Sequence, residues 1–459
     1  LPGTKVKKEN HSYSKIYQLM LLKAINPVNG EVIQSYPSHS EAQVVEKINQ
    51  TFHAWQSWKL SSFSERSDSL YKTASALRDN KEKLARLMAM EMGKPIKAGI
   101  AEIEKCADVC DYYAEKAEVF LRDETIKTDA QKSYVCFEPL GVILAVMPWN
   151  FPFWQVFRFL APCLMAGNCA VLKHASNVPG CAIAIEELIR EAGLPDNVFQ
   201  TLLIDSKGVN SVIENKLISA VTLTGSVEAG KKVAEKAGSL LKKTVLELGG
   251  SDAYLVLADA DLELAAETCV NSRLINSGQS CIAAKRFIVI KEIAEKFTLL
   301  FKDKMSAKVM GDPFDEKTDI GPQARNDLRD ALHQQVLESI DKGAICILGG
   351  KIPEGNTAFY PPTILTSVKK GMPAYDEELF GPVASIIIAE DEKEAVKIAN
   401  DSIFGLGAAV FSSDILRAEE VARKIEAGSC FVNSLVRSDP RLPFGGIKQS
   451  GYGRELALY

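Results

Sequence analysis

Cys281 lies in the stretch INSGQSCIAAKR, residues 275–286, and is one of ten cysteines in the chain. A cysteine is most often a small buried hydrophobic residue, which is the simplest interpretation. The alternative is a nucleophile, because a thiolate with a base and an oxyanion site beside it attacks carbonyl carbons. The cysteines form no CxxC pair, and no histidine lies at metal-ligand spacing from them. We therefore expect no bound metal.

Two other residues have the chemistry that such a thiol needs. Glu247 ends the apolar run TVLE and either caps a turn or points into a cleft, where desolvation would raise its pKa and make it a better base near neutral pH. Asn150 lies in PWNFP, 148–152, where two prolines fix a turn that enters a helix. Its side-chain amide is the kind of donor that an oxyanion hole requires.

Trp154 and Arg158 follow that turn and lie four residues apart, so they share one face of the predicted helix. The arginine stands among Trp, Phe and Val residues, and a buried guanidinium needs an anion. The anion is either an internal Asp or Glu or a carboxylate on a bound substrate. The sequence leaves both interpretations open.

Two segments have the residues of a nucleotide site. In SAVTLTGSVEAG an apolar strand runs into Gly225 and Ser226, a helix begins there, and Gly230 lies one turn later. A helix N-terminus beside glycine can bind phosphate, although a plain strand-turn-helix fits equally well. In VLKHAS, Lys173 ends a strand and could bind ribose hydroxyls or phosphate, or be a surface residue. Ser176, unlike a carboxylate, would not repel a 2′-phosphate.

The elements that must position these residues alternate between β-rich and helical runs, which predicts an α/β fold with a parallel, doubly wound sheet. We expect residues 1–25 to be a loosely ordered arm and a ligand to bind in the cleft between two halves. The expected helices are 40–58, 62–92 and 96–120. The expected strands are 142–147, 170–173, 198–203, 220–224 and 244–247, then a second alternating set from 253 to about 432 that includes 287–290, 385–389 and 408–411.

Composition excludes several classes of protein. A chain of 459 residues is too long for one ordinary core, so two or three domains are expected. The net charge is −5 and no basic stripe is present, so we expect no nucleic-acid partner. No run approaches the roughly 18 apolar residues of a membrane span. Ten cysteines without a pairing pattern indicate reduced thiols and a cytoplasmic protein.

Together these motifs resemble the aldehyde dehydrogenase superfamily over nearly the whole chain. The matching segments are PWNFP (148–152), TGS (224–226), LELGG (246–250), GQSC (278–281), EELFGP (377–382) and PFGGIKQSGYGRE (443–455). The resemblance implies that Cys281 attacks the aldehyde, that Asn150 and the Cys281 N–H hold the oxyanion, and that Glu247 activates water to hydrolyse the thioester. A non-catalytic protein would need fewer of these residues. A cysteine hydrolase would need a catalytic histidine.

The resemblance also implies a cofactor site. Glu378 matches the residue that binds the nicotinamide ribose, with Phe380 and Trp149 near it. Lys173 and Ser176 fall at the adenosine ribose or its phosphate, and Gly225, Ser226 and Gly230 fall at the pyrophosphate turn. Ser176 resembles the NADP-preferring members, so NADP is expected, with NAD as the alternative.

Within the superfamily the chain is most similar to short bacterial succinate semialdehyde dehydrogenases, through KHASNVPG (173–180), FWQVFR (153–158) and VRSDPRLPFGG (436–446). In that group the residues matching Trp154, Arg158 and Ser438 contact the substrate, and the arginine and serine hold its carboxylate. The expected substrate is therefore succinate semialdehyde. Glutarate semialdehyde or a broad range of aliphatic aldehydes are the alternatives, because one methylene changes binding by only about 1–3 kcal/mol.

The family fold implies a Rossmann-like cofactor domain, an α/β catalytic domain and a small oligomerisation extension. We expect these over 1–119 with 140–249, over 250–438, and over 120–139 with 439–459. A homodimer or homotetramer is expected. Family chains usually continue beyond the Arg454-Glu455 pair, whereas this sequence runs from Leu1 to Tyr459, so we expect both ends to be trimmed.

Overall fold

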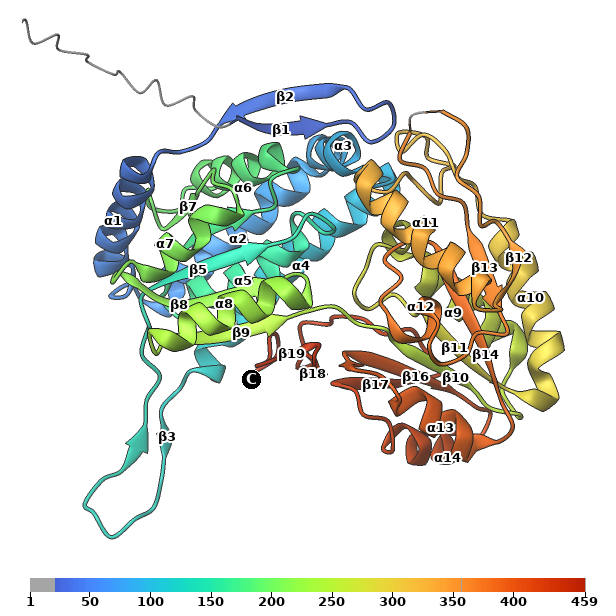
Figure 1. Cartoon of the computed structure of the whole chain (residues 1–459). Coiled ribbons are helices and arrows are strands. Elements are labelled where there is room, and N and C mark those ends of the chain that lie inside the picture. Colours follow the sequence, from blue (N-terminus) through green and yellow to red (C-terminus); the bar gives the residue numbers. More distant parts are fainter. Residues whose placement is uncertain (1–20, 356, 459) are drawn as a thin grey trace, which may run out of the picture.

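The computed structural model describes residues 21–355 and 357–458, which form two α/β halves with the C-terminal segment lying between them (Figure 1). Most of the predicted arm, residues 1–20, lies outside the described residues. The remainder of that prediction is wrong, because β1 (Leu21–Ile25) pairs antiparallel with β2 (Val32–Pro37). Leu22 and Ala24 face the protein and are buried, and this alternation stabilises a strand.

The first half is built on a six-stranded sheet of order β19-β9-β8-β5-β6-β7, parallel except for β19. Its strands are β5 (Val142–Met147), β6 (Cys169–His174), β7 (Phe199–Thr201), β8 (Ile218–Thr224), β9 (Lys243–Glu247) and β19 (Gly451–Tyr452). The helices of this half are α1 (Glu41–Trp58), α2 (Phe63–Asp79), α3 (Lys81–Met92), α4 (Ile96–Phe120), α5 (Trp154–Met165), α6 (Pro179–Glu191), α7 (Val209–Glu214) and α8 (Val227–Ser239), with the 3-10 turn η1 (Ser206–Gly208).

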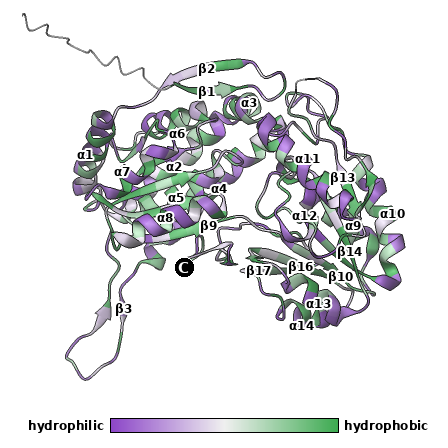
Figure 2. Ribbon diagram, viewed as in Figure 1, coloured by the Kyte–Doolittle hydropathy of each residue, from purple (hydrophilic) through white to green (hydrophobic). Residues whose placement is uncertain are grey.

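Both faces of this sheet are buried, which explains its nearly continuous apolar strands. Val142 and Leu144 of β5 pack with α1, α7 and α8, whereas Ile143 and Ala145 pack with α2 to α6. Figure 2 shows the resulting pattern of hydrophobic strands and two-coloured helices. The single helix predicted over 62–92 is two helices, because the backbone leaves helical geometry at Asn80 (φ −104°, ψ 6°).

The second half is built on a seven-stranded sheet of order β12-β13-β14-β11-β10-β16-β17, in which β12 is antiparallel to β13. Its strands are β10 (Ala253–Val256), β11 (Arg286–Ile290), β12 (Ile345–Leu348), β13 (Thr363–Thr366), β14 (Val383–Ala389), β16 (Gly407–Phe411) and β17 (Ser429–Val432). The helices are α9 (Leu262–Leu274), α10 (Ala294–Ser306), α11 (Asn326–Asp341), α12 (Pro373–Asp376), α13 (Glu392–Asn400) and α14 (Ile415–Ala422), with η2 (Ile275–Gly278) and η3 (Lys291–Ile293).

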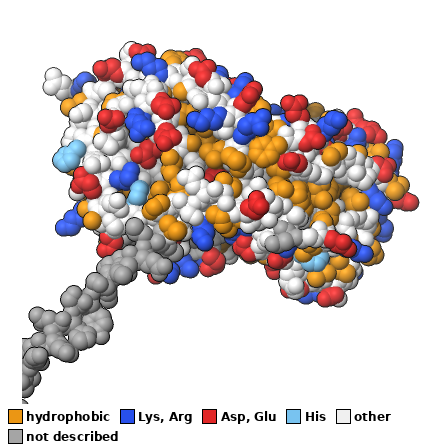
Figure 3. Space-filling model, turned by 90° about the horizontal axis from the view of Figure 1, so that it is seen from above, with side chains coloured by type: hydrophobic (Ala, Val, Ile, Leu, Met, Phe, Trp, Pro, Cys, Tyr) orange, Lys and Arg blue, Asp and Glu red, His pale blue; other side chains and the backbone are white. Residues whose placement is uncertain are grey.

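Short strand pairs complete the chain. The hairpin of β3 (Glu124–Thr125) and β4 (Tyr134–Val135) projects away from both halves (Figure 1). β15 (Phe404–Gly405) pairs with β18 (Ile447–Lys448) in a small sheet of their own, and β19 pairs with β9, so the C-terminal segment contacts both halves. On the face in Figure 3, acidic and basic side chains are interspersed. No helix in the described ranges is long and apolar enough to cross a bilayer.

Candidate active site

The loop before Cys281 has an unusual backbone. Three consecutive residues of η2 are left-handed: Asn276 (φ 52°), Ser277 (φ 57°) and Gly278 (φ 78°). Such a conformation costs about 1–2 kcal/mol for a residue other than glycine, so surrounding contacts must hold it. Asn276 donates to the Asn150 carbonyl (2.7 Å), and a Cβ at Gly278 would overlap the backbone of Gly381. The nucleophile segment is therefore fixed by PWNFP on one side and by EELFGP on the other.

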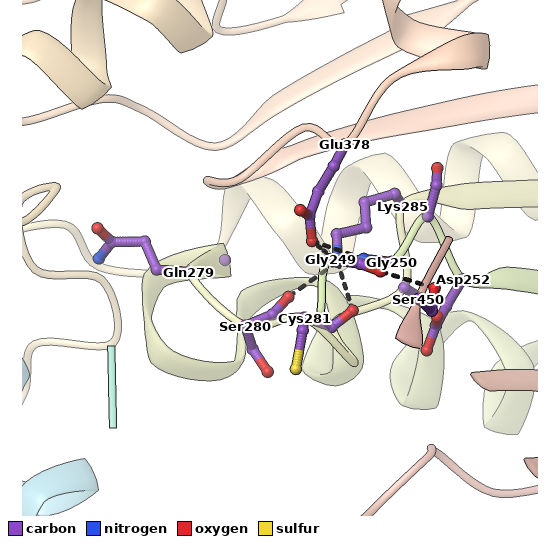
Figure 4. Close-up of polar contacts among 12 residues, drawn as sticks. Gly249, Gly250, Asp252, Gln279, Ser280, Cys281, Lys285, Glu378 and Ser450 are labelled. Atoms are coloured by element: carbon purple, nitrogen blue, oxygen red, sulfur yellow. Dashed lines mark hydrogen bonds and ion pairs between the residues drawn. The ribbon is translucent and has the colours of Figure 1, made fainter. Parts of the chain in front are cut away.

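Lys285 holds the same loop from its C-terminal side (Figure 4). Its ammonium donates to the carbonyls of Ser280 (2.8 Å) and Cys281 (2.7 Å) and lies 3.3 Å from Glu378 Oε1. The same oxygen of Glu378 accepts from the Gly250 N–H (3.0 Å). The Cys281 sulfur points away from this cluster, so the thiol is left free while its backbone is restrained.

Two cavities meet at the half-buried Cys281 thiol, one of about 120 Å³ and one of about 260 Å³. All ten cysteines, each in the described part of the chain, are free. Burial raises the pKa of Cys281 to about 12, although Lys285 and Arg158 oppose the shift. The resting thiol is therefore protonated at neutral pH and needs a base before it can attack.

The larger of these cavities collects the residues predicted for the nicotinamide end of a cofactor. Trp149 and Phe380 meet edge to face there, with ring centroids 5.7 Å apart. Ser226 is the N-cap of α8 and accepts from the Ala229 N–H (3.3 Å). The lining consists of Pro148, Trp149, Asn150, Thr224, Gly225, Ser226, Leu248, Gly249, Cys281, Leu328, Glu378 and Phe380.

Gly230 lies one turn into α8 but does not line this cavity. It is buried on α8 against Leu248, where a Cβ would lie 2.5 Å from a methyl group of that leucine. Its observed role is thus the close packing of α8 on the segment after β9, which sets where the helix N-terminus lies.

Lys173 and Ser176 line a separate, more open cavity of about 740 Å³, which Trp149 also reaches. Lys173 also lines a cavity of about 550 Å³ between η1, α7 and α8. Burial lowers the pKa of Lys173, and Asp205 partly offsets this. Asp205 lies in the same cavity as Ser176, but its Oδ1 already accepts from the N–H groups of Lys207 and Gly208.

Asn150 is buried beside Cys281, as an oxyanion donor must be. Its Nδ2 donates one hydrogen bond, to the Gln279 carbonyl (3.1 Å). An amide nitrogen carries two hydrogens, so one remains for a further acceptor.

Glu247 ends β9 and is 2 % exposed. Within the described ranges neither of its carboxylate oxygens has a hydrogen-bond partner. Burial raises the pKa of Glu247 well above its usual value, Arg158 lowers it, and Glu455 raises it again. The carboxyl packs over Gly445, where a Cβ would lie 2.8 Å from Oε1. A buried carboxyl without a partner and with a raised pKa is a candidate for proton transfer.

The smaller cavity contains all three residues predicted to contact substrate. Trp154 Nε1 donates to Ser438 Oγ (3.1 Å), and both side chains are buried. Arg158 faces an internal acid, because its Nε lies 2.5 Å from Glu455 Oε2, and its Nη2 donates to Thr224 (3.1 Å). The internal-partner interpretation of Arg158 therefore applies in this structure. The lining consists of Lys105, Phe151, Trp154, Gln155, Arg158, Ile275, Ser280, Cys281, Ile282, Leu435, Val436, Arg437, Ser438 and Phe444.

This arrangement of thiol, amide, carboxyl and two cavities agrees with the sequence comparison, in which the aldehyde dehydrogenase family profile matches residues 18–459. The chain belongs to that family. It is 48 % identical over 437 residues to a probable succinate-semialdehyde dehydrogenase [NADP(+)] of Synechocystis, covering 95 % of this chain and 96 % of the relative. It is 45 % identical to the succinate semialdehyde dehydrogenase [NAD(P)+] Sad of Escherichia coli, covering 95 % and 94 %.

A solved structure shows the same fold. The succinic semialdehyde dehydrogenase of Streptococcus pyogenes in complex with NADP+ superposes with a TM-score of 0.93 at 39 % identity, covering 95 % of this chain and 96 % of that one. The predicted α/β aldehyde dehydrogenase fold is thus confirmed, and the chain is an NAD(P)-dependent oxidoreductase.

Three further side chains that lie at this site were not predicted as site residues. Lys105 comes from α4, Lys285 from the end of the nucleophile loop, and Glu455 from the C-terminal segment. Lys285 had a usable signal, since a lysine in the apolar run IAAKRFIVI must find acceptors. Glu455 ends the motif PFGGIKQSGYGRE, which marked the segment but not the partner of its carboxylate, whereas Lys105 lies outside every motif.

His174 is the histidine nearest to these motifs in sequence, and it serves structure. Its Nε2 lies 2.9 Å from the Pro152 carbonyl, and its Nδ1 accepts from the Ala175 N–H (2.9 Å). These bonds tie the end of β6 to PWNFP. They leave His174 no free nitrogen for the base of a cysteine hydrolase.

Proposed function

We propose that this enzyme oxidises succinate semialdehyde to succinate with NADP as the preferred cofactor. The observation that carries the proposal is the small cavity at Cys281, which is lined by three cationic side chains, Arg158, Lys105 and Arg437, and by two serines, Ser280 and Ser438. A cavity of about 120 Å³ is below the usual range for drug-sized ligands, so it suits a short chain. The names of the relatives in Synechocystis and Escherichia coli support the same substrate.

The chemistry begins at the Cys281 sulfur. Its proton passes to a base, and the thiolate attacks the aldehyde carbon to give a tetrahedral thiohemiacetal. The negative charge on the former carbonyl oxygen is stabilised by the free hydrogen of Asn150 Nδ2 and by the Cys281 N–H. Glu247, once deprotonated, removes a proton from the water that hydrolyses the resulting thioester, which releases the acid and restores the thiol.

The cofactor site fits a dinucleotide. The exposed α8 N-terminus, the glycines of the larger cavity and the Trp149–Phe380 pair form a space for the pyrophosphate and nicotinamide. Glu378 would hold the nicotinamide ribose. Lys173 and Ser176 would hold the adenosine ribose and its 2′-phosphate. Bound NADP supplies the acceptor for the hydride that leaves the thiohemiacetal.

Trp154, Arg158 and Ser438 are proposed to contact the substrate. Arg158 and Ser438 would bind the carboxylate while the aldehyde carbon lies at Cys281. Glutarate semialdehyde has the same two groups one methylene further apart, so weaker turnover of it is expected. Broad use of neutral aliphatic aldehydes is the competing function.

The wider organisation is part of the same proposal. The six-stranded half is assigned to the cofactor, the seven-stranded half to catalysis, and the β3–β4 hairpin with residues 439–459 to oligomerisation. A homodimer or homotetramer in the cytoplasm is proposed. The exposed Ile126, Tyr134, Val135 and Phe137 of the hairpin region support an assembly contact.

The test is a comparison of kcat/KM for succinate semialdehyde and for pentanal, each with NADP and with NAD. The proposal expects at least a ten-fold preference for the acidic aldehyde, since a charge-assisted bond contributes roughly 1.5–3 kcal/mol. Arg158→Lys keeps a charge toward Glu455 but loses the planar fork, and should lower that preference. Arg190→Lys, at an exposed site on α6, is the control. Equal use of both aldehydes by the unaltered enzyme would favour the broad aliphatic function.

A further inference from the structure

Lys105 enters the substrate cavity from α4, a helix that carries none of the motifs. Its ammonium donates to Ser438 Oγ (2.8 Å) and lies 3.9 Å from the centroid of the Trp154 ring. Both of these partners are residues assigned to the substrate. Lys105 therefore lies among the residues predicted to contact the substrate, although it was not predicted itself.

The charge of Lys105 is not balanced by an acid. Among the described residues no carboxylate lies within ion-pair distance of it, and Arg158 is a like-charged neighbour. The two nearest acids are already engaged. Glu102 pairs with Lys94 and accepts from two N–H groups at the start of α5, and Asp439 binds Arg441 through both oxygens.

The unbalanced charge around Lys105 is reflected in its pKa. Burial and, to a smaller extent, Arg158 lower the pKa of Lys105 to about 8, whereas Cys106, Glu102 and Asp439 act in the opposite direction. A half-buried ammonium beside a guanidinium is stabilised when an anion binds between them. At neutral pH the group is still mostly protonated and can bind one.

Arg158 and Lys105 differ in what they already hold. Arg158 is paired with Glu455 and Thr224, so a substrate carboxylate must share or displace an internal partner. Within the described ranges, the contacts of the Lys105 ammonium are the Ser438 hydroxyl and the face of the Trp154 ring. Ser438 accepts from both Lys105 and Trp154, which uses its two lone pairs, so its own hydrogen is left to donate.

We propose that Lys105 is a specificity-determining residue whose ammonium, together with the Ser438 hydroxyl, binds the carboxylate of the acidic aldehyde. The proposal rests on the proposed function and deepens it, because it places the anion site between α4 and α5 instead of at Arg158 alone. It also explains why Glu102 and Lys105 lie one turn apart. Glu102 fixes the start of α5, and Lys105 then faces the first turn of that helix.

The experiment compares Lys105→Met, Lys105→Arg and the unaltered enzyme with succinate semialdehyde and with pentanal. Lys105→Met should lower kcat/KM for the acidic aldehyde about ten-fold or more, mainly through KM, and change pentanal less than about three-fold. Lys105→Arg should retain most of the preference. Lys116→Met, on the same helix but exposed to solvent, is the matched control.

A pH profile separates binding from packing. In the unaltered enzyme the ratio of the two kcat/KM values should fall as pH rises through 8, because Lys105 loses its charge. The ratio should stay level in Lys105→Arg, which remains charged. Ionisation of Cys281 and Glu247 affects both aldehydes alike and cancels in the ratio.

The outcomes are distinguishable. If the unaltered enzyme does not prefer the acidic aldehyde, the proposed function fails. If it does prefer it and Lys105→Met keeps the full preference, or loses activity equally with both aldehydes, the role of Lys105 is overturned. Melting temperatures of the variants show whether equal losses come from folding.

Discussion

The two cavities that meet at Cys281 are built in opposite ways. The cofactor side is made of backbone, glycines and a helix N-terminus, and most of its residues come from short continuous motifs. The substrate side is made of long charged and aromatic side chains from α4, α5, the nucleophile loop and residues 435–444. On the proposed assignment, a cofactor common to many enzymes would be held by local backbone geometry, whereas the substrate would be selected by side chains that the fold brings together.

Removing the thiol should have the largest effect, because Cys281 serves both cavities. Cys281→Ala is expected to lower kcat with any aldehyde and either cofactor by about a thousand-fold or more. Initial rates of cofactor reduction measure this loss. Cys136→Ala, at an exposed cysteine beside the β3–β4 hairpin, should be fully active. Retained turnover in Cys281→Ala would show that Cys281 is not the nucleophile at which the two cavities meet.

Substitution of Glu247 tests whether its buried carboxyl acts after hydride transfer. Glu247→Gln should lower steady-state kcat by about a hundred-fold or more while the first turnover stays fast. Stopped-flow absorbance would then record a burst of reduced cofactor followed by a slow phase. Glu187→Gln, an exposed acid on α6, is the control. A variant that loses the burst as well would assign Glu247 to thiol activation instead.

Ser176 lies in a cavity assigned to the cofactor and does not line the substrate cavity, so its substitution should affect the cofactor alone. Ser176→Glu should weaken NADP by about ten-fold or more through repulsion of the 2′-phosphate and leave NAD nearly unchanged. KM values for the two cofactors, with Ser176→Ala as the control, measure the change. The preference for acidic over neutral aldehyde should not move. A shift in that preference would show that the two cavities are coupled.

His174 ties the end of β6 to PWNFP, and its replacement should have the smallest effect, on stability. Burial lowers its pKa from 6.5 to about 4, so between these pH values the unfolded chain binds the extra proton and stability falls as pH drops. The loss is about 1.4 kcal/mol per pH unit over that window. His174→Gln should flatten this part of the dependence of melting temperature on pH between 7 and 5. An unchanged slope would contradict the assignment.

The sequence predicted what is local. Gly225, Ser226, Asn150 and Cys281 fall in motifs whose spacing reflects strand ends and helix starts, and the structure brings all four to the larger cavity. The parallel sheet followed from apolar runs such as 142–147, whose two faces are both buried. The break at Asn80 was missed because hydrophobic periodicity continues across it in both helices.

Contacts between distant segments could not be predicted. Arg158 clearly needed an anion, but nothing in the sequence named Glu455, which lies about 300 residues further on. Lys105 is indistinguishable in sequence from the solvent-exposed Lys116 on the same helix. Gly230 had a nucleotide-site spacing, yet the side chain it faces, Leu248, makes it a packing residue.

The return of the C-terminal segment to the first sheet has a consequence for synthesis. Strands β5 to β9 of the first sheet, which end at Glu247, leave the ribosome about 200 residues before Glu455, which is roughly 10 to 40 s at the usual speed of translation. During that time β9 lacks its neighbour β19, and Arg158 lacks its acid. A nascent chain can therefore form its nucleotide-binding core early, but its catalytic pocket acquires its charge balance only when translation is nearly complete.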